Sequence, residues 1–252
     1  MRLTDVDTPA LVWDLDVVER NLERMGRLVS SHGVAHRPHA KSHKTWELAA
    51  MQREAGAIGH TVAKVGEAEV MVQGGFGDLL IAYPVLGTSK INRIAHLLDA
   101  GADITIAVDS LEVARAASAD LGRPAAAGGP SRKRLGILIE IDSGFGRCGV
   151  QDTEQALELA GGISRLPGVE LRGVMGFAGQ AYGETDTGLR RRIGREEGRQ
   201  AADVARALAA AGHEAPVVSV GCTPSTYGAV EADGVSEVRA GVYVFNDRKQ
   251  AT

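Results

Sequence analysis

The residues most able to react with a carbonyl compound lie in one short polar segment, residues 37–44 (RPHAKSHK). The segment coincides with the carboxyl end of a predicted strand at 36–39, and it contains Lys41 and Lys44. A lysine that is desolvated or close to other cations holds more of its amine in the neutral form, which attacks carbonyl carbons. A solvated basic turn would contain the same residue types, so this segment alone leaves both interpretations open.

A metal site is a second alternative for this part of the chain. Four histidines could supply imidazole ligands: His36, His39, His43 and His60. The neighbouring lysines and arginine would repel a cation, and no carboxylate or thiol lies close in the sequence. The segment therefore favours carbonyl chemistry over metal binding.

Two further segments place polar side chains after predicted strands. The segment IEIDSGFGRCGV at 139–150 combines closely spaced glycines, which allow close backbone approach to a ligand, with Arg147, a possible fork donor to an anion. The segment GFAGQAYG at 176–183 offers Gln180 and Tyr182 to a planar ligand. A structural ion pair of Arg147 with a nearby carboxylate, and an ordinary loop at 176–183, are the alternatives.

The last two predicted strands end in segments suited to phosphate. In VSVGCTPS at 218–225, Thr223 followed by proline is typical of a helix N-cap with a first-turn proline, and helix starts offer unpaired N–H donors to anions. The segment VRAGVY at 238–243 adds a second glycine turn at Gly241. Barrel enzymes frequently bind phosphate with the loops after their seventh and eighth strands.

The elements that must position these residues alternate along the chain. Several predicted strands are nearly continuous apolar runs, which is typical of strands covered on both faces in a parallel sheet. Eight strands within 252 residues favour a (β/α)₈ barrel over an open doubly wound sheet. The predicted strands are residues 36–39, 58–62, 79–82, 104–108, 135–141, 171–177, 217–220 and 238–244. The predicted helices are residues 17–32, 45–55, 65–74, 89–100, 110–121, 153–166 and 186–211.

Two segments fall outside this alternation. Residues 10–14 (ALVWD) form a predicted strand that precedes the eight, and the Gly/Pro-rich residues 122–134 form a predicted loop. We therefore expect residues 1–15 to lie outside a barrel domain of residues 16–252.

Composition excludes several classes of protein. The chain has 44% hydrophobic and 24% charged residues, which is typical of globular domains and unlike disordered chains or coiled coils. A net charge of −4 provides no basic footprint for nucleic acid, and no apolar run approaches the ~18 residues of a membrane span. The chain lacks the apolar core of a signal peptide, and its two cysteines are far apart. We therefore expect a cytoplasmic location.

Taken together, the segments place a lysine at one side of a barrel mouth and a phosphate cup at the other. A phosphorylated carbonyl compound held as a Schiff base fits that arrangement. Pyridoxal 5′-phosphate is the first candidate. A sugar-phosphate aldolase without a coloured cofactor is the alternative.

Six motifs resemble the D-threonine aldolase/D-serine dehydratase-like proteins, which are pyridoxal phosphate enzymes with the alanine-racemase-type barrel. In chain order the motifs are TPALVWDLD, RPHAKSHKT, GFGDLLIAYPV, IEIDSGFGRCGV, GCTPST and RAGVYVFND, spanning residues 8–247. RPHAKSHKT is the most specific of them. The resemblance implies an α/β fold, a (β/α)₈ barrel of the alanine racemase N-terminal type with an extra N-terminal strand.

The resemblance also implies roles for individual residues. Lys41, rather than Lys44, corresponds to the lysine that binds the cofactor as a Schiff base. Thr223, Gly241 and Val242 correspond to the phosphate cup.

Four more residues correspond to contacts of the cofactor ring. Arg147 resembles the arginine beside the phenolate oxygen, and Arg239 resembles the arginine that faces the pyridine nitrogen in alanine racemases. Gln180 and Tyr182 match contacts in the dehydratase-like branch, where the counterpart of Tyr182 also lies near the pyridine nitrogen. Arg239 and Tyr182 thus compete for one ring atom.

The implied activity is a pyridoxal phosphate-dependent lyase acting on D-β-hydroxy amino acids, either an aldolase or a dehydratase. An amino-acid racemase and a non-catalytic barrel for cofactor homeostasis are the alternatives. Members of the family form homodimers and carry a C-terminal β domain with a divalent metal, Mn²⁺ or Zn²⁺. This sequence lacks that domain, so we expect metal assistance only in a longer chain, and little lyase turnover from these 252 residues alone.

Overall fold

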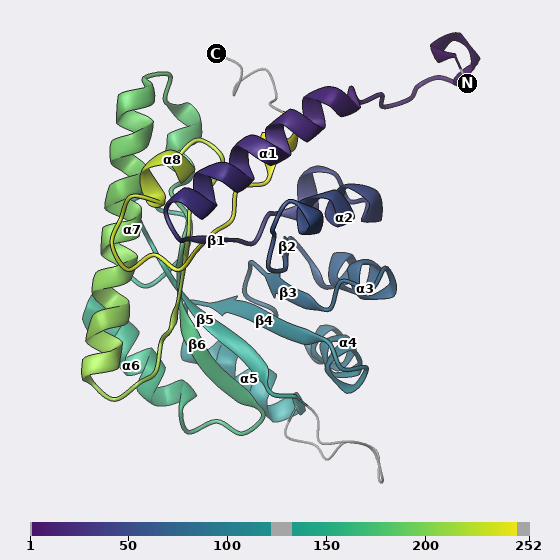
Figure 1. The fold of residues 1–252 in the computed structure, drawn as a ribbon. Helices are drawn as coiled ribbons and strands as arrows, with labels where there is room; N and C mark the ends of the chain where they lie inside the picture. Colours follow the sequence, from purple (N-terminus) through teal and green to yellow (C-terminus); the bar gives the residue numbers. More distant parts are fainter. Residues whose placement is uncertain (1, 122–132, 246–252) are drawn as a thin grey trace.

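The fold is centred on one curled parallel sheet (Figure 1). The computed structural model describes residues 2–121 and 133–245, so nearly all of the predicted loop at 122–134 lies outside the described residues. The eight strands follow the order β1-β8-β7-β6-β5-β4-β3-β2. They are β1 (Ala35–His36), β2 (His60–Val62), β3 (Asp78–Ile81), β4 (Asp103–Val108), β5 (Leu135–Ile141), β6 (Val169–Gly176), β7 (Val217–Val220) and β8 (Glu237–Val238).

The two ends of this sheet meet and close it. Single parallel bridges join His36 to Ala57 and His39 to Thr61, next to β1 and β2. The neighbouring strands of the sheet pair in parallel, and β5 is buried along its whole length, as its unbroken apolar run predicts. The predicted (β/α)₈ barrel is confirmed.

Helices cover the outer face of the sheet (Figure 1). They are α1 (Leu15–Ser31), α2 (Trp46–Glu54), α3 (Val65–Gln73), α4 (Thr88–Asp99), α5 (Leu111–Leu121), α6 (Thr153–Ile163), α7 (Thr187–Ala210) and α8 (Thr226–Ala229). The main core lies between these helices and the strands, and a smaller apolar cluster of Leu80, Ala107, Leu138 and Met175 fills the inside of the barrel. None of the helices in the described part combines the length and apolar content needed to cross a membrane.

The eighth strand is much shorter than predicted. Residues 242–244, placed in a strand by the sequence, instead form a 3₁₀ helix, η4 (Val242–Val244), so the strand prediction is wrong there. After Ala240, which accepts a hydrogen bond from His39 N, the chain passes close to the end of β1. A Cβ at Gly241 would lie 2.6 Å from the His39 carbonyl oxygen. Glycine permits this approach, and the chain turns away from the sheet.

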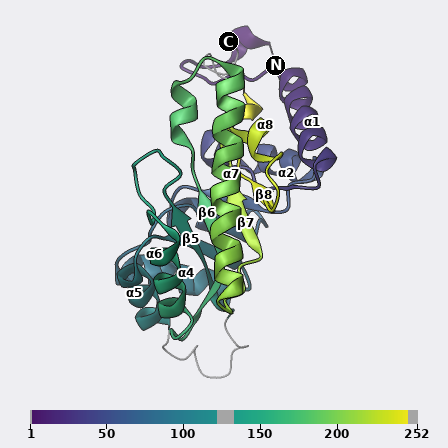
Figure 2. The ribbon, with the colours of Figure 1, turned by 90° about the vertical axis from the view of Figure 1, so that its left-hand side faces the viewer.

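The helix after β7, α8, is a single turn. The long helix α7 covers part of the outer face of β7 that a longer α8 would otherwise cover. Figure 2 shows α7 running along the barrel with α8 against its upper half. The two helices touch through glycines, since a Cβ at Gly194 of α7 would overlap the Ser225 backbone and one at Gly228 of α8 would overlap the Arg191 backbone. The position of α8 therefore depends on close backbone contact with α7.

The N-terminal segment forms no strand of the barrel sheet. Residues 10–14 have no strand partner within the described part of the chain, and the side chains of Leu11 and Val12 are exposed. Trp13 nevertheless packs against Phe245, with ring centroids 5.3 Å apart. Whether residues 10–14 pair with another sheet stays a prediction.

Candidate active site

The carboxyl ends of the strands surround a cavity of about 250 Å³. In parallel barrels this end of the sheet carries the reactive groups. The loops after β1, β5, β6, β7 and β8 all contribute to its wall. Six of the eight predicted site residues line it: Lys41, Arg147, Tyr182, Arg239, Gly241 and Val242.

The two candidate lysines have different surroundings. Lys41 lies in the 3₁₀ helix η2 (Ala40–Ser42) and lines the cavity. Burial, followed by the charges of Arg147 and Arg239, lowers the pKa of its amine. Lys44 does not line the cavity; its ammonium donates to Glu67 at 2.6 Å, and its side chain is 58% exposed. Lys41 is thus the lysine whose environment favours the neutral, nucleophilic amine.

Arg147 is held at the cavity wall by stacking. Its guanidinium lies 4.6 Å from the ring centroid of Phe177 and 5.8 Å from that of Phe145. It also donates to Glu140 Oε1 at 3.4 Å, which is the structural ion pair considered as the alternative. Its side chain remains half exposed, so the pairing and a contact with a bound anion are compatible.

Arg239 is the most deeply buried cation of the cavity. Its Nη1 donates to Ser219 Oγ at 2.7 Å, and its Nη2 donates to the Gly176 carbonyl oxygen at 2.5 Å. These two bonds fix the plane of the guanidinium at the base of the cavity. Tyr182 lines the same cavity, so the structure brings together both residues that compete for the pyridine nitrogen.

Gly241 and Val242 provide the best match to a phosphate. Both residues line the cavity at the start of η4, and within the described residues their backbone N–H groups have no acceptor. Buried backbone donors are nearly always paired, so two unpaired donors at a cavity wall suit an oxyanion. These donors fit a phosphate group, and Arg147 and Arg239 in the same cavity add positive charge that suits the phosphate and phenolate oxygens of pyridoxal phosphate.

Thr223 and Gln180 do not line this cavity. The Thr223 hydroxyl accepts from Tyr243 N at 3.1 Å, and the residue lies on a second groove between α1, α7 and α8. Gln180 Nε2 donates to the Ser143 carbonyl oxygen at 2.9 Å. Thr223 is also not the helix cap that the sequence suggested, because α8 begins at Thr226 after a turn closed by its N–H donating to Cys222 O.

Sequence reasoning missed Glu197 of α7. This buried carboxylate accepts from the backbone N–H groups of Ala178 at 3.1 Å and Gly221 at 2.9 Å, and from Ser225 Oγ at 3.2 Å. It therefore joins the segments after β6 and β7. The available signal was a glutamate on the buried face of a long amphipathic helix, where an apolar residue would be expected.

The four histidines do not assemble a metal site. Across residues 2–121 and 133–245, no group of three or more His, Cys, Asp or Glu is arranged to hold a metal ion. His36 Nε2 lies 3.2 Å from the Ala240 carbonyl oxygen, and His43 Nε2 lies 3.1 Å from Gln52 Oε1. Among them only His39 lines the cavity, where burial, followed by the charge of Lys41, lowers its pKa well below the ordinary value.

The chain is similar to characterised proteins over nearly its whole length. Residues 13–249 match the family described as "Alanine racemase, N-terminal domain". The chain is 40% identical to D-threo-3-hydroxyaspartate dehydratase of Delftia sp., over 97% of this chain and 63% of that protein. It is 34% identical to 3-hydroxy-D-aspartate aldolase of Paracoccus denitrificans, over 97% of this chain and 62% of that protein.

The solved structures give the same result. D-threonine aldolase from Filomicrobium marinum superposes with a TM-score of 0.90 at 34% identity, covering 99% of this chain and 65% of that one. The chain thus spans less than two thirds of the length of these relatives.

Proposed function

Because this chain belongs to the alanine racemase N-terminal domain family, we propose that it binds pyridoxal 5′-phosphate at Lys41 and acts as a lyase on D-β-hydroxy amino acids. The observation that carries the proposal is the cavity itself. It places a lysine of lowered pKa opposite two backbone N–H groups without an acceptor in the described part of the chain. One cofactor that carries both an aldehyde and a phosphate would engage both.

Each polar group of the cavity has a task in this proposal. The N–H groups of Gly241 and Val242 hold the phosphate, and Arg147 donates to the phenolate oxygen. The neutral amine of Lys41 would hold the aldehyde carbon of the cofactor, with loss of water, and Nζ would accept or return a proton when the substrate amine takes its place. Bound pyridoxal phosphate supplies the electron-withdrawing ring that weakens the bonds at the substrate Cα.

The substrate class comes from the relatives. Proteins named as dehydratase or aldolase of 3-hydroxyaspartate, and as D-threonine aldolase, share 34–40% identity with this chain. All three names describe amino acids with a hydroxyl group at Cβ. We extend this class, and not one particular amino acid, to the present chain. We propose that any assistance by Mn²⁺ or Zn²⁺ needs ligands outside the described residues.

Racemisation is the second candidate, and Arg239 is the observation that favours it. An arginine at the pyridine nitrogen donates a hydrogen bond to that nitrogen and holds it unprotonated, since a guanidinium does not give up its proton at neutral pH. An unprotonated ring withdraws fewer electrons from Cα. That suits transfer of a single proton more than reactions that need a long-lived carbanion.

Lys41→Ala and Lys44→Ala form a matched pair for the test. Each protein is incubated with pyridoxal phosphate, reduced with borohydride and analysed by peptide mass spectrometry. We expect label on Lys41 in the parent and in Lys44→Ala, and at least ~90% loss in Lys41→Ala, because among the lysines of the described residues only Lys41 lines the cavity. Equal labelling of both variants would refute the assignment. Assays of D-threonine, D-serine, 3-hydroxy-D-aspartate and alanine then separate lyase from racemase activity.

A further inference from the structure

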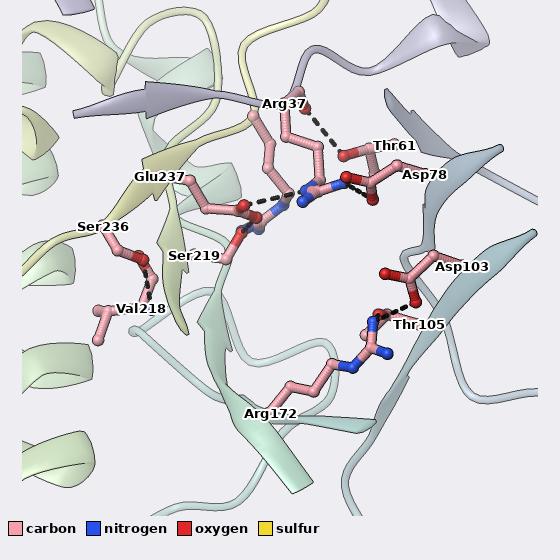
Figure 3. A network of polar contacts seen from close by, with 11 residues as sticks. Arg37, Thr61, Asp78, Asp103, Thr105, Arg172, Val218, Ser219, Ser236 and Glu237 are labelled. Atoms are coloured by element: carbon pink, nitrogen blue, oxygen red, sulfur yellow. Dashed lines mark hydrogen bonds and ion pairs between the residues drawn. The ribbon is translucent and has the colours of Figure 1, made fainter. Parts of the chain in front are cut away.

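A chain of polar contacts leads from the cavity into the interior of the barrel. The Ser219 hydroxyl accepts from Arg239 Nη1 at 2.7 Å and donates to Glu237 Oε1 at 2.6 Å. Glu237 Oε2 accepts from Arg37 Nε at 2.9 Å, and Arg37 Nη1 donates to Asp78 Oδ1 at 2.5 Å. Figure 3 shows the part of this chain between Ser219 and Asp78, which crosses from β7 and β8 to the start of β3.

The charges along this chain alternate in sign. Arg239 and Arg37 are cations, while Glu237 and Asp78 are anions, so the four side chains together carry no net charge. The side chains of Glu237 and Arg37 are 4% and 14% exposed, so water screens the interaction between their charges only weakly. Buried charges persist only when they are paired and hydrogen-bonded.

The guanidinium of Arg239 depends on such compensation. Burial lowers its pKa, and the opposing charges that face it are Glu197, Glu237 and Glu140, with the Cys222 thiol beside them. Among the contacts of the described residues, Glu237 is joined to Arg239 through one hydroxyl, whereas Glu197 binds backbone N–H groups and Glu140 faces Arg147. Ser219 is thus the link between the cavity and the charge behind it.

We infer that Ser219 and Glu237 are positioning residues for Arg239. The Ser219 hydroxyl orients the guanidinium toward the cavity, and Glu237, held by that hydroxyl, adds to the negative charge that keeps the buried arginine charged. Neither Ser219 nor Glu237 lines the cavity. This inference rests on the proposed binding of pyridoxal phosphate, with Arg239 facing its ring.

A second polar group inside the same barrel provides matched controls (Figure 3). Arg172 Nη1 donates to Thr105 Oγ1 at 2.9 Å and lies 2.6 Å from Asp103 Oδ1. Both groups line one small cavity of about 80 Å³ inside the barrel, but among the described residues the hydrogen bonds of the Arg239 guanidinium go to Ser219 and Gly176 and not to the Arg172 group. Thr105→Val removes a hydroxyl as Ser219→Ala does, and Asp103→Asn neutralises a carboxylate as Glu237→Gln does.

Two measurements on the full chain separate positioning from general stability. The first is the dissociation constant of pyridoxal phosphate, from absorbance titration. Ser219→Ala should weaken binding roughly tenfold, because a hydrogen bond to a charged group is lost. The second is the pH midpoint of the visible absorbance of bound cofactor. Glu237→Gln should lower it by about one unit, because the added positive potential disfavours the protonated Schiff base.

The controls decide between the outcomes. Thr105→Val and Asp103→Asn should leave affinity within about twofold and the midpoint within ~0.2 units of the parent, although they remove similar interactions. If both test variants match their controls in both measurements, the inference is wrong. If Glu237→Gln does not fold, the affinity of Ser219→Ala against Thr105→Val decides alone. If the parent forms no bond with the cofactor at Lys41, the proposed function fails and this inference with it.

Discussion

Replacing Gly194 with alanine should destabilise the protein, although alanine is the better helix former. The new Cβ would lie 2.8 Å from Ala229 N and 2.9 Å from the Ser225 carbonyl carbon, and closer still to the Ser225 oxygen. Non-bonded heavy atoms prefer separations of ~3.5–4.0 Å. The neighbours are backbone atoms of α8 and cannot rotate away, so α8 must shift as a unit.

The magnitude follows from two opposing effects. Alanine in place of glycine within a helix gains about 1 kcal/mol. Overpacking in a filled interior costs roughly 1–3 kcal/mol, and contact with backbone places this site at the upper end. The net loss is then about 2 kcal/mol, which lowers Tm by roughly 4–8 °C for a chain of this size.

Gly161→Ala in α6 is the matched control for this prediction. A Cβ there has no neighbour closer than Arg165 Nη1 at 4.0 Å, so the same substitution should raise stability by about 0.5–1 kcal/mol. Thermal unfolding followed by circular dichroism measures both. Pyridoxal phosphate affinity should fall only in Gly194→Ala, because Cys222 lines the cavity and is bonded to Ser225. A rise in Tm for both variants would show that α7 and α8 leave room for a Cβ at Gly194, and would refute the argument.

Three further predictions concern single residues. Burial lowers the pKa of His36 to about 4, so between pH 6.5 and 4 the unfolded chain binds a proton that the folded chain excludes. Acidification through this window should remove up to about 3 kcal/mol of the free energy of unfolding. Urea unfolding at several pH values should therefore show a weaker pH dependence in His36→Gln than in the parent. Phe177→Leu should weaken pyridoxal phosphate binding roughly three- to fivefold, because the ring that stacks on Arg147 is lost; titration showing unchanged affinity would contradict this role. Iodoacetamide should modify Cys148 at least about ten times faster than Cys222, since burial raises the pKa of the Cys222 thiol to about 12; peptide mass spectrometry giving equal rates would contradict this expectation.

The strands were predictable wherever burial on both faces leaves an apolar run. The sequence places strands at 135–141 and 217–220 with the observed bounds, because every position in them faces either the helices or the barrel interior. The same reasoning failed at 242–244. Tyr243 and Val244 are buried in the main core, next to α1, and local pattern cannot distinguish that packing from a strand.

The candidate site was predictable to the extent that strand ends determine it. Arg239 directly follows β8, and Lys41 lies in the short 3₁₀ helix after β1, so the topology brings them to one cavity. Gln180 lies in a 3₁₀ helix, Gly179–Gly183, and Thr223 lies in a turn; their side chains contact other partners that only the three-dimensional packing reveals. The interior network was not predictable, because Arg37, Glu237 and Ser219 are separated by up to 200 positions in the sequence.

The dependence of the segment after β7 on α7 limits how this barrel can be recombined. Barrels of this kind are often treated as strings of exchangeable strand–helix modules, each bringing its own cover. Here the sixth module supplies the long helix α7, while the seventh carries only the short α8. Glu197 of α7 bonds to backbone groups that follow both strands. A chimera with its crossover between these two modules would separate Glu197 from its backbone donors after β7, and Gly194 of α7 from Gly228 of α8. A crossover before β6 would transfer all of these residues together.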